Sequence, residues 1–188
     1  EIQSGELDVY PEQQSTQESN NAKMASSPCS VSELNDRYGG YAELEEVRET
    51  LFALLAAERA GAQVCALSLK DVTSMEWQQL LLGVHLGVHR DEAGSCKLLI
   101  DCLENLQIEP HEDIGDFVGK CMSIPNFIER MELLNKGQAW VVRKLDTLLP
   151  RLRSEFVREK LIRMRDEHLE NISKLEVFLE TRRGSSEA

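Results

Sequence analysis

Apolar side chains recur every three to four residues along most of the chain, which is the spacing of one buried face of an α-helix. Four stretches keep this spacing and are separated by segments with polar residues, glycine or proline. They predict helices over about 41–70, 77–102, 125–148 and 150–182. We therefore predict an all-α fold in which four amphipathic helices bury their apolar faces against one another as a four-helix bundle.

Local signals mark where these helices begin and end. Thr73 and Glu76 resemble a capping box, in which a hydroxyl and a carboxylate bind the free amides at the start of a helix. Pro150 suits the first turn of the fourth helix, because proline has no amide to lose there. Gly184 is expected to end that helix.

The lengths of the connections predict the topology. The first and last connections are a few residues long, so each joins an antiparallel hairpin. The middle connector, about residues 105–123, carries Pro110, Gly115 and a small apolar cluster, which predicts one short helix. Its roughly 19 residues can span about 60 Å, more than the ~40 Å of a helix of about 27 residues. We predict a long crossover between the hairpins, although a simple up-and-down order with a folded connector also fits.

Composition favours one folded domain behind a polar tail. A chain of 188 residues with 41% hydrophobic residues is long enough for one core but short for two. We expect residues 1–40 to form a flexible acidic tail, 41–183 the helical domain and 184–188 a short C-terminal tail. Met24 makes a natural start, so residues 1–23 are open to interpretation as a leader or a linker.

Charge and cysteine content narrow the classes of partner. The net charge of −12 argues against nucleic acid and anionic membranes, which reward clustered positive charge. We find no uninterrupted apolar run of the ~20 residues that a bilayer span requires, and no signal-peptide pattern, which predicts a cytoplasmic protein. The five cysteines are scattered and form no CxxC pair, so we expect reduced core residues rather than disulfides or a zinc site.

Polar residues at core positions are the candidates for function, because burying an unpaired charge costs several kcal/mol. Every predicted helix has at least one: Glu58 on the first, His85, His89 and Glu92 on the second, Glu132, Asn135 and Gln138 on the third, and His168 on the fourth. If the first hairpin turns near residues 72–73, Glu58 lies level with residues 86–88. Carboxylates and imidazoles from all four helices would then meet in the middle of the bundle.

Four segments carry a family resemblance. LLAAERAGA, HRDEAGSC, LNKGQAWVVRKL and DEHLENI resemble a small bacterial ferritin-like family of unknown function, and the resemblance covers about residues 42–182. For the wider superfamily it implies a four-helix bundle, frequent homodimers and, in many members, a di-iron or di-manganese centre used for oxidation or iron storage. Here it implies iron or manganese bound by Glu58, Glu92 and His168, with His89 or Glu132 completing the ligands.

A second interpretation needs no metal. A complete di-metal site takes four carboxylates and two imidazoles, whereas this chain has Arg165 three residues before His168 and Gln138 on the central line of the third helix. The polar residues would then form a paired network that includes Gln138, with Arg143 or Arg90 neutralising the carboxylates. The protein would be a non-catalytic module that dimerises or binds a protein partner. Whether the chain is an enzyme stays undecided at this point.

Overall fold

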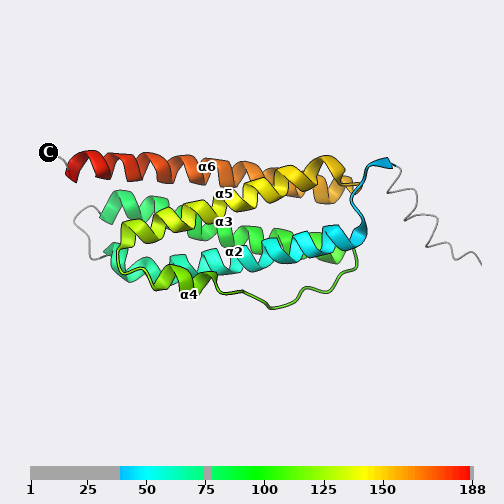
Figure 1. Ribbon diagram of the computed structural model, residues 1–188, viewed down its shortest axis with the longest axis horizontal. Helices are drawn as coiled ribbons and strands as arrows, with labels where there is room; N and C mark the ends of the chain where they lie inside the picture. The colour runs from blue at the N-terminus through cyan, green and yellow to red at the C-terminus, as the bar shows by residue number, and fades with distance from the viewer. Residues whose placement is uncertain (1–38, 74–77, 187–188) are drawn as a thin grey trace, which may run out of the picture.

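The structure is a computed structural model that describes residues 39–73 and 78–186 of the chain. Within these residues it is built from helices and contains no strand. The elements are α2 (Leu44–Thr73), α3 (Gln78–Asn105), α4 (Phe117–Met122), α5 (Phe127–Leu148), the 3₁₀ turn η1 (Leu149–Arg151) and α6 (Glu155–Ser186), shown in Figure 1. The prediction of an all-α fold is confirmed.

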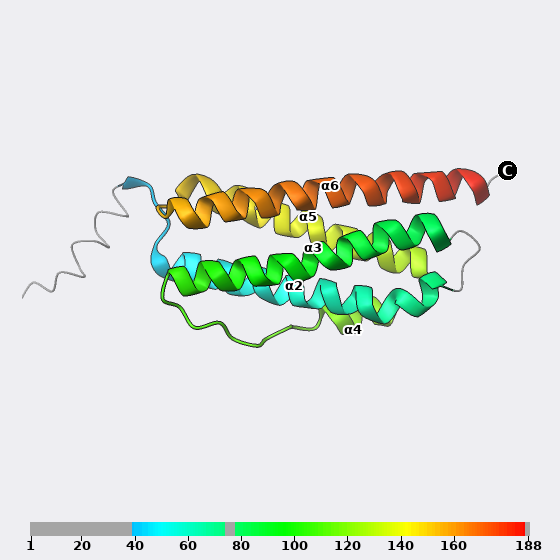
Figure 2. The ribbon, with the colours of Figure 1, turned by 180° about the vertical axis from the view of Figure 1, so that it is seen from behind.

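The four long helices pack side by side as a bundle. Helix α2 runs antiparallel to α3, and α5 runs antiparallel to α6 (Figures 1 and 2). Helices α2 and α6 each pack against both α3 and α5, so α2 and α6 face each other across the bundle axis. After α3 the connector runs back along the length of the bundle, and α5 therefore runs in the same direction as α3. The predicted crossover is confirmed, and α4 is its short helix.

The ends of the last two helices follow local chemistry. The side chain of Asn126 accepts hydrogen bonds from the amides of Ile128 and Glu129, at 2.9 and 3.2 Å, and so caps the start of α5. Pro150 lies in η1 and not in α6, so the predicted start of the fourth helix is wrong. The chain makes one 3₁₀ turn, extends at Leu152 and enters α6 only at Glu155.

The predicted end of the fourth helix lies among the described residues, whereas the predicted start of the second helix lies partly outside them. Helix α6 continues past Gly184 to Ser186, because glycine lowers helix stability without preventing a helical conformation. The prediction that Gly184 ends this helix is therefore wrong. Thr73 is the last residue of α2, and the rest of the expected capping box, including Glu76, lies outside the described residues.

The core consists of two apolar clusters, one toward each end of the bundle. One cluster includes Leu54, Leu99, Val141 and Met164, and the other includes Val64, Val88, Leu134 and Leu175. On every long helix a buried polar residue lies in sequence between its contributions to the two clusters. Each helix supplies one of Glu58, Glu92, Gln138 and His168, which we call the polar layer, and Ser95, Asn135 and Asn171 are also buried in these intervals.

Helix α2 is the most apolar of the described helices by one measure. Its segment Leu44–Asp71 is long and apolar enough to cross a membrane by length and composition alone, although charged residues such as Glu58 and Arg59 interrupt its apolar run. In the structure its apolar face, including Leu51, Leu54 and Leu55, packs into the bundle core. That placement is consistent with the core helix of a soluble protein.

Arg130 joins the start of α5 to the end of α2. Its side chain is 4% exposed and donates hydrogen bonds to Ser68 Oγ at 3.1 Å, to Asp71 Oδ2 at 2.6 Å and to the carbonyl oxygen of Ile124 at 2.9 Å. Because these acceptors lie on α2 and on the segment before α5, the guanidinium fixes how the two hairpins meet.

We expect Arg130→Met to lower the free energy of unfolding by at least about 2 kcal/mol, because several partly buried acceptors lose a charged donor. The matched control is Arg158→Met, which removes the partner of the exposed Glu155 and should change stability by less than about 1 kcal/mol. Urea unfolding followed by circular dichroism measures both variants. Equal losses would contradict the structural role of Arg130.

Candidate metal centre

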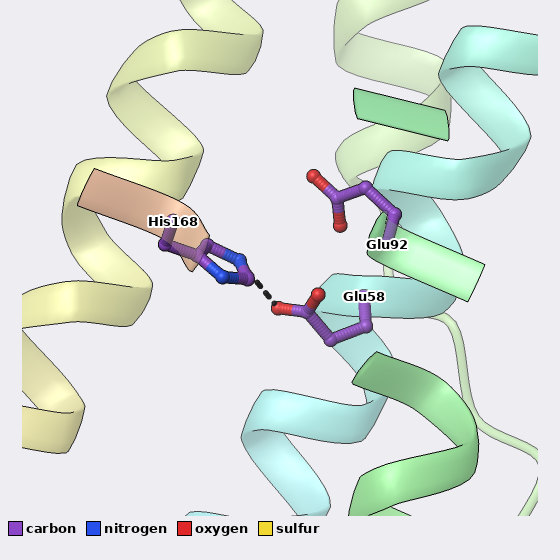
Figure 3. Close-up of side chains that lie close together, drawn as sticks. All are labelled: Glu58, Glu92 and His168. Carbon is purple, nitrogen blue, oxygen red and sulfur yellow. Dashed lines mark hydrogen bonds and ion pairs between the residues drawn. The ribbon is translucent and has the colours of Figure 1, made fainter. Parts of the chain in front are cut away.

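Three ionisable side chains of the polar layer point toward one another at mid-bundle. Glu58 comes from α2, Glu92 from α3 and His168 from α6 (Figure 3). Their exposed fractions are 0%, 5% and 2%. One potential ligand atom from each lies within 4.8 Å of the other two. The three helices therefore present two carboxyl groups and one imidazole to a single buried point.

The imidazole of His168 is oriented from both sides. Its Nδ1 lies 2.9 Å from the carbonyl oxygen of Met164, and its Nε2 lies 3.1 Å from Glu58 Oε1. A carbonyl oxygen can only accept a hydrogen bond, so Nδ1 carries a proton and donates it to Met164. In the neutral ring Nε2 then has its lone pair directed at the carboxylates. Metal-bound histidines commonly have this arrangement.

Glu92 reaches Glu58 because α2 has no side chain at Gly61. A Cβ atom at this position would lie 2.5 Å from Glu92 Oε2 and 2.6 Å from its carboxyl carbon. Glycine inside a helix lowers helix stability by about 1 kcal/mol relative to alanine. At position 61 glycine provides the space that the Glu92 carboxyl group occupies. The role of Gly61 was not predicted from the sequence. A glycine within the apolar stripe of a helix could have indicated a close contact at this position.

Burial and mutual charge set the protonation of this site. Burial raises the pKa of Glu92 well above its ordinary value, and the charge and hydrogen bond of Glu58 and the charge of Asp91 raise it further. Burial lowers the pKa of His168, but the charge of Glu58 and the hydrogen bonds to Glu58 and Met164 outweigh it, so the pKa is raised. Burial and the charge of Glu58 therefore favour the protonated form of Glu92, and the charge of Glu58 favours the imidazolium form of His168.

Gln138 completes the polar layer from α5. Its side chain is 2% exposed, and neither its Oε1 nor its Nε2 has a hydrogen-bond partner among the described residues. Because nearly all buried polar atoms in proteins are hydrogen-bonded, this amide is suited to a water molecule or another polar group beside Glu58 and Glu92.

A cleft of about 590 Å³ connects the polar layer to the surface. It is lined by residues of α2, α4 and α5 and of the segment just before α4, together with Glu92 of α3. Glu58, Glu92 and Gln138 line its buried part. Phe117 of α4 packs so closely on Gly137 that a Cβ atom there would lie 3.0 Å from the ring. The crossover therefore forms one wall of the route to the site.

The structure brings Glu58, Glu92 and His168 together as predicted, but His89 and Glu132 are half-buried and do not belong to this group. Glu58 faces Glu92 and Cys65 faces His85, so residues of α2 lie level with residues of α3 about five positions later than predicted. This register brings Glu92 level with Glu58 and moves His89 about one turn away. Neither His89 nor Glu132 lies in the group formed by Glu58, Glu92 and His168, so the structure does not place either of them as a further metal ligand.

The predicted cation of the buried network is also corrected. Arg143 is exposed, because it lies five residues after Gln138 and so about 140° around the helix. Arg90 is exposed too and pairs with Asp91 at 3.1 Å. The group that faces Glu58 is His168, and Gln138 is buried as expected.

His85 has a role apart from the polar layer. Its ring is 3% exposed, and Nε2 lies 2.7 Å from the carbonyl oxygen of Cys65. Burial lowers the pKa of His85, which favours a neutral ring that donates to this carbonyl. It therefore links α3 to α2 and does not pair with His89 as a metal site. The described cysteines, Cys65, Cys96, Cys102 and Cys121, are free, as expected.

Comparison with known proteins identifies the family. Residues 45–177 match the family described as Domain of unknown function (DUF6306). The chain belongs to this family. The matched range contains the whole polar layer and the connector that lines the cleft. No curated protein and no solved structure matches the chain significantly.

Protonation of Glu92 predicts an unusual pH dependence of stability in metal-free protein. An unfolded glutamate ionises near its ordinary pKa of about 4.3, whereas folded Glu92 keeps its proton to higher pH. Its contribution to stability therefore falls as pH rises above the unfolded value, by up to about 1.4 kcal/mol per pH unit. The raised pKa of His168 acts in the same direction above about pH 6.5.

We expect Glu92→Gln to gain stability relative to the wild type as the pH rises from about 5 to about 8, because glutamine cannot ionise. Urea unfolding in buffer with a chelator measures the difference at each pH. The matched control is Glu104→Gln, an exposed position on the same helix, for which the difference should stay constant. A constant difference for Glu92→Gln would contradict the assigned protonation.

Proposed function

We propose that this protein is a ferritin-like bundle that binds one iron or manganese ion at the polar layer and acts in oxidation or metal handling. The observation that carries the proposal is the convergence of Glu58, Glu92 and His168, with ligand atoms within 4.8 Å of one another beside a cleft. Their positions on three helices support a site defined by the tertiary fold.

The chemistry of the donors supports this choice of metal. Carboxylate and imidazole ligands suit first-row divalent ions such as Mn²⁺ and Fe²⁺. Two ligands at about 2.0–2.2 Å from an ion lie at most about 4.4 Å apart, so small side-chain rotations would bring these atoms into range. The hydrogen bond from His168 Nδ1 to Met164 would hold the ring in place for ligation through Nε2.

The number of ligands supports one ion rather than two. A complete di-metal site uses four carboxylates and two imidazoles, and the polar layer offers Glu58, Glu92 and His168, with Gln138 on the remaining helix. Two carboxylates balance the charge of a divalent ion. Glu58, Glu92 and His168 would hold the ion, and Gln138 and the cleft lie beside them. A bound ion would supply Lewis-acid or one-electron redox chemistry there.

The site exchanges protons for metal. Glu92 and His168 must lose their protons before they can ligate, so metal affinity should increase with pH. In the metal-free protein the same protons neutralise the site, which explains how the carboxyl groups remain buried without an ion.

The rival function is a scaffold whose polar layer is only a paired network. The hydrogen bond between Glu58 and His168 favours it, because this pair already neutralises the charge of the buried carboxylate. The scaffold accounts for Glu58 and His168 but leaves both polar atoms of Gln138 without partners. The metal titration below decides between the two functions.

We expect the full chain, freed of metal with a chelator, to bind one Mn²⁺ per chain in calorimetry and in electron paramagnetic resonance. Saturation at 100 times the dissociation constant should stabilise the fold by about 2.7 kcal/mol. Glu92→Gln should lower the affinity at least tenfold, because it removes an anionic ligand, whereas Glu104→Gln should not. Absence of bound Mn²⁺, and of Fe²⁺ in an anaerobic repeat, would support the scaffold instead.

A second variant tests the geometry without removing a ligand. Gly61→Ala would push the Glu92 carboxyl group away from Glu58, so we expect at least a tenfold loss of Mn²⁺ affinity. The control is Gly94→Ala, which meets nothing within 4 Å and should stabilise α3 by up to about 1 kcal/mol with unchanged Mn²⁺ binding. Unchanged Mn²⁺ binding in Gly61→Ala would contradict the role of Glu92 as a ligand.

A further inference from the structure

The cleft carries functional groups on the wall formed by α5. Lys136, Trp140 and Arg143 are spaced four and three residues apart, so they lie along one side of the helix, and all three line the cleft. Gly137 leaves room beside them for the ring of Phe117 from α4. Phe117 and the α5 wall therefore bring two aromatic side chains and two cations to the cleft. Ionisable groups on its other sides are Glu58, Glu92, Asp116 and Lys120.

The two cations on this wall are not neutralised. Lys136 and Arg143 are exposed, and neither side chain makes an ion pair or a hydrogen bond within the described part of the chain, although the backbone carbonyl of Arg143 accepts a hydrogen bond from Thr147. A third cation at the cleft, Lys120, pairs with Asp116 at 2.7 Å. In a chain with a net charge of −12, two unpaired cations beside one cleft favour an anionic ligand.

The buried part of the cleft favours a polar group on the ligand. Gln138 is 2% exposed and offers a donor and an acceptor that no protein group uses. An amide of this kind binds a hydroxyl, carbonyl or carboxyl group. A volume of about 590 Å³ lies within the range of about 300–1,000 Å³ that is common for small-molecule sites. The cleft thus fits a ligand with a polar group at the inner end and an acidic group at the outer end.

We propose that the cleft binds a small organic acid with an apolar body. Lys136 and Arg143 hold its acid group, Phe117 and Trp140 contact its body, and Gln138 receives a polar group next to Glu58 and Glu92. The proposal that this acid is a substrate rests on the proposed function, because the inner end of the acid would lie beside the residues that bind the metal. Binding of the acid itself requires only residues of the cleft wall.

Three probes with the same body and different charge test the proposal. Phenylbutyrate, phenylbutyramide and phenylbutylamine, each with a para hydroxyl group that can reach Gln138, are titrated by calorimetry into the full chain after metal is removed with a chelator. We expect the anion to bind at least tenfold more tightly than the amide, and the amine to bind most weakly. Equal affinities for the anion and the amide, or binding of none of the three, would overturn the proposal.

Charge variants identify the groups responsible. The double variant Lys136→Gln/Arg143→Gln should reduce the affinity for phenylbutyrate to that for the amide. The control Lys97→Gln/Lys174→Gln has the same change in net charge at exposed positions that do not line the cleft, and should keep the preference. An equal loss in the control would attribute the preference to net charge and would overturn the proposal.

A Mn²⁺ titration of the same preparation separates this proposal from the proposed function. Binding of phenylbutyrate without binding of Mn²⁺ would overturn the metal centre and support the anion site. Binding of Mn²⁺ without a preference for the anionic probe would support the metal centre and overturn the anion site.

Discussion

The burial of Glu58 is the constraint on which the rest of this structure depends. A carboxylate with no exposed surface is strongly unfavourable unless nearby groups neutralise it. The neutralising groups come from other helices: the imidazole of His168 lies across the bundle axis, and Glu92 contributes a protonated carboxyl group. The two apolar clusters pack on either side of this layer, and Gly61 provides the space that Glu92 needs.

The crossover determines how this buried layer meets the solvent. By running back along the bundle it places α4 beside α5, where Phe117 packs on Gly137. Arg59 of α2 donates a hydrogen bond to the carbonyl oxygen of His111 and so holds the connector against the bundle. Glu58, Glu92 and Gln138 line the buried part of the resulting cleft, whereas His168 does not line it and is enclosed by the core.

The polar layer and the wall of the cleft differ in charge. In the proposed metal centre, protons or a divalent ion would balance the charge of the polar layer, and metal binding would therefore depend on pH. The cleft wall carries cations without partners, whereas basic residues elsewhere, such as Lys174 and Arg151, are paired with Glu170 and Glu46. The inner and outer ends of the cleft thus favour different groups of one ligand.

The sequence by itself determined the four long helices and the polar residues Glu58, Glu92, Gln138 and His168, because helical periodicity is local and a polar residue within an apolar stripe is visible in it. The tertiary structure decided between the crossover and a simple up-and-down order, and it decided which polar residues meet. The register of α2 against α3 placed Glu92 rather than His89 beside Glu58, and helix rotation buried Gln138 but exposed Arg143. Register and rotation depend on packing between helices, such as the contact at Gly61, and no single helix encodes that packing.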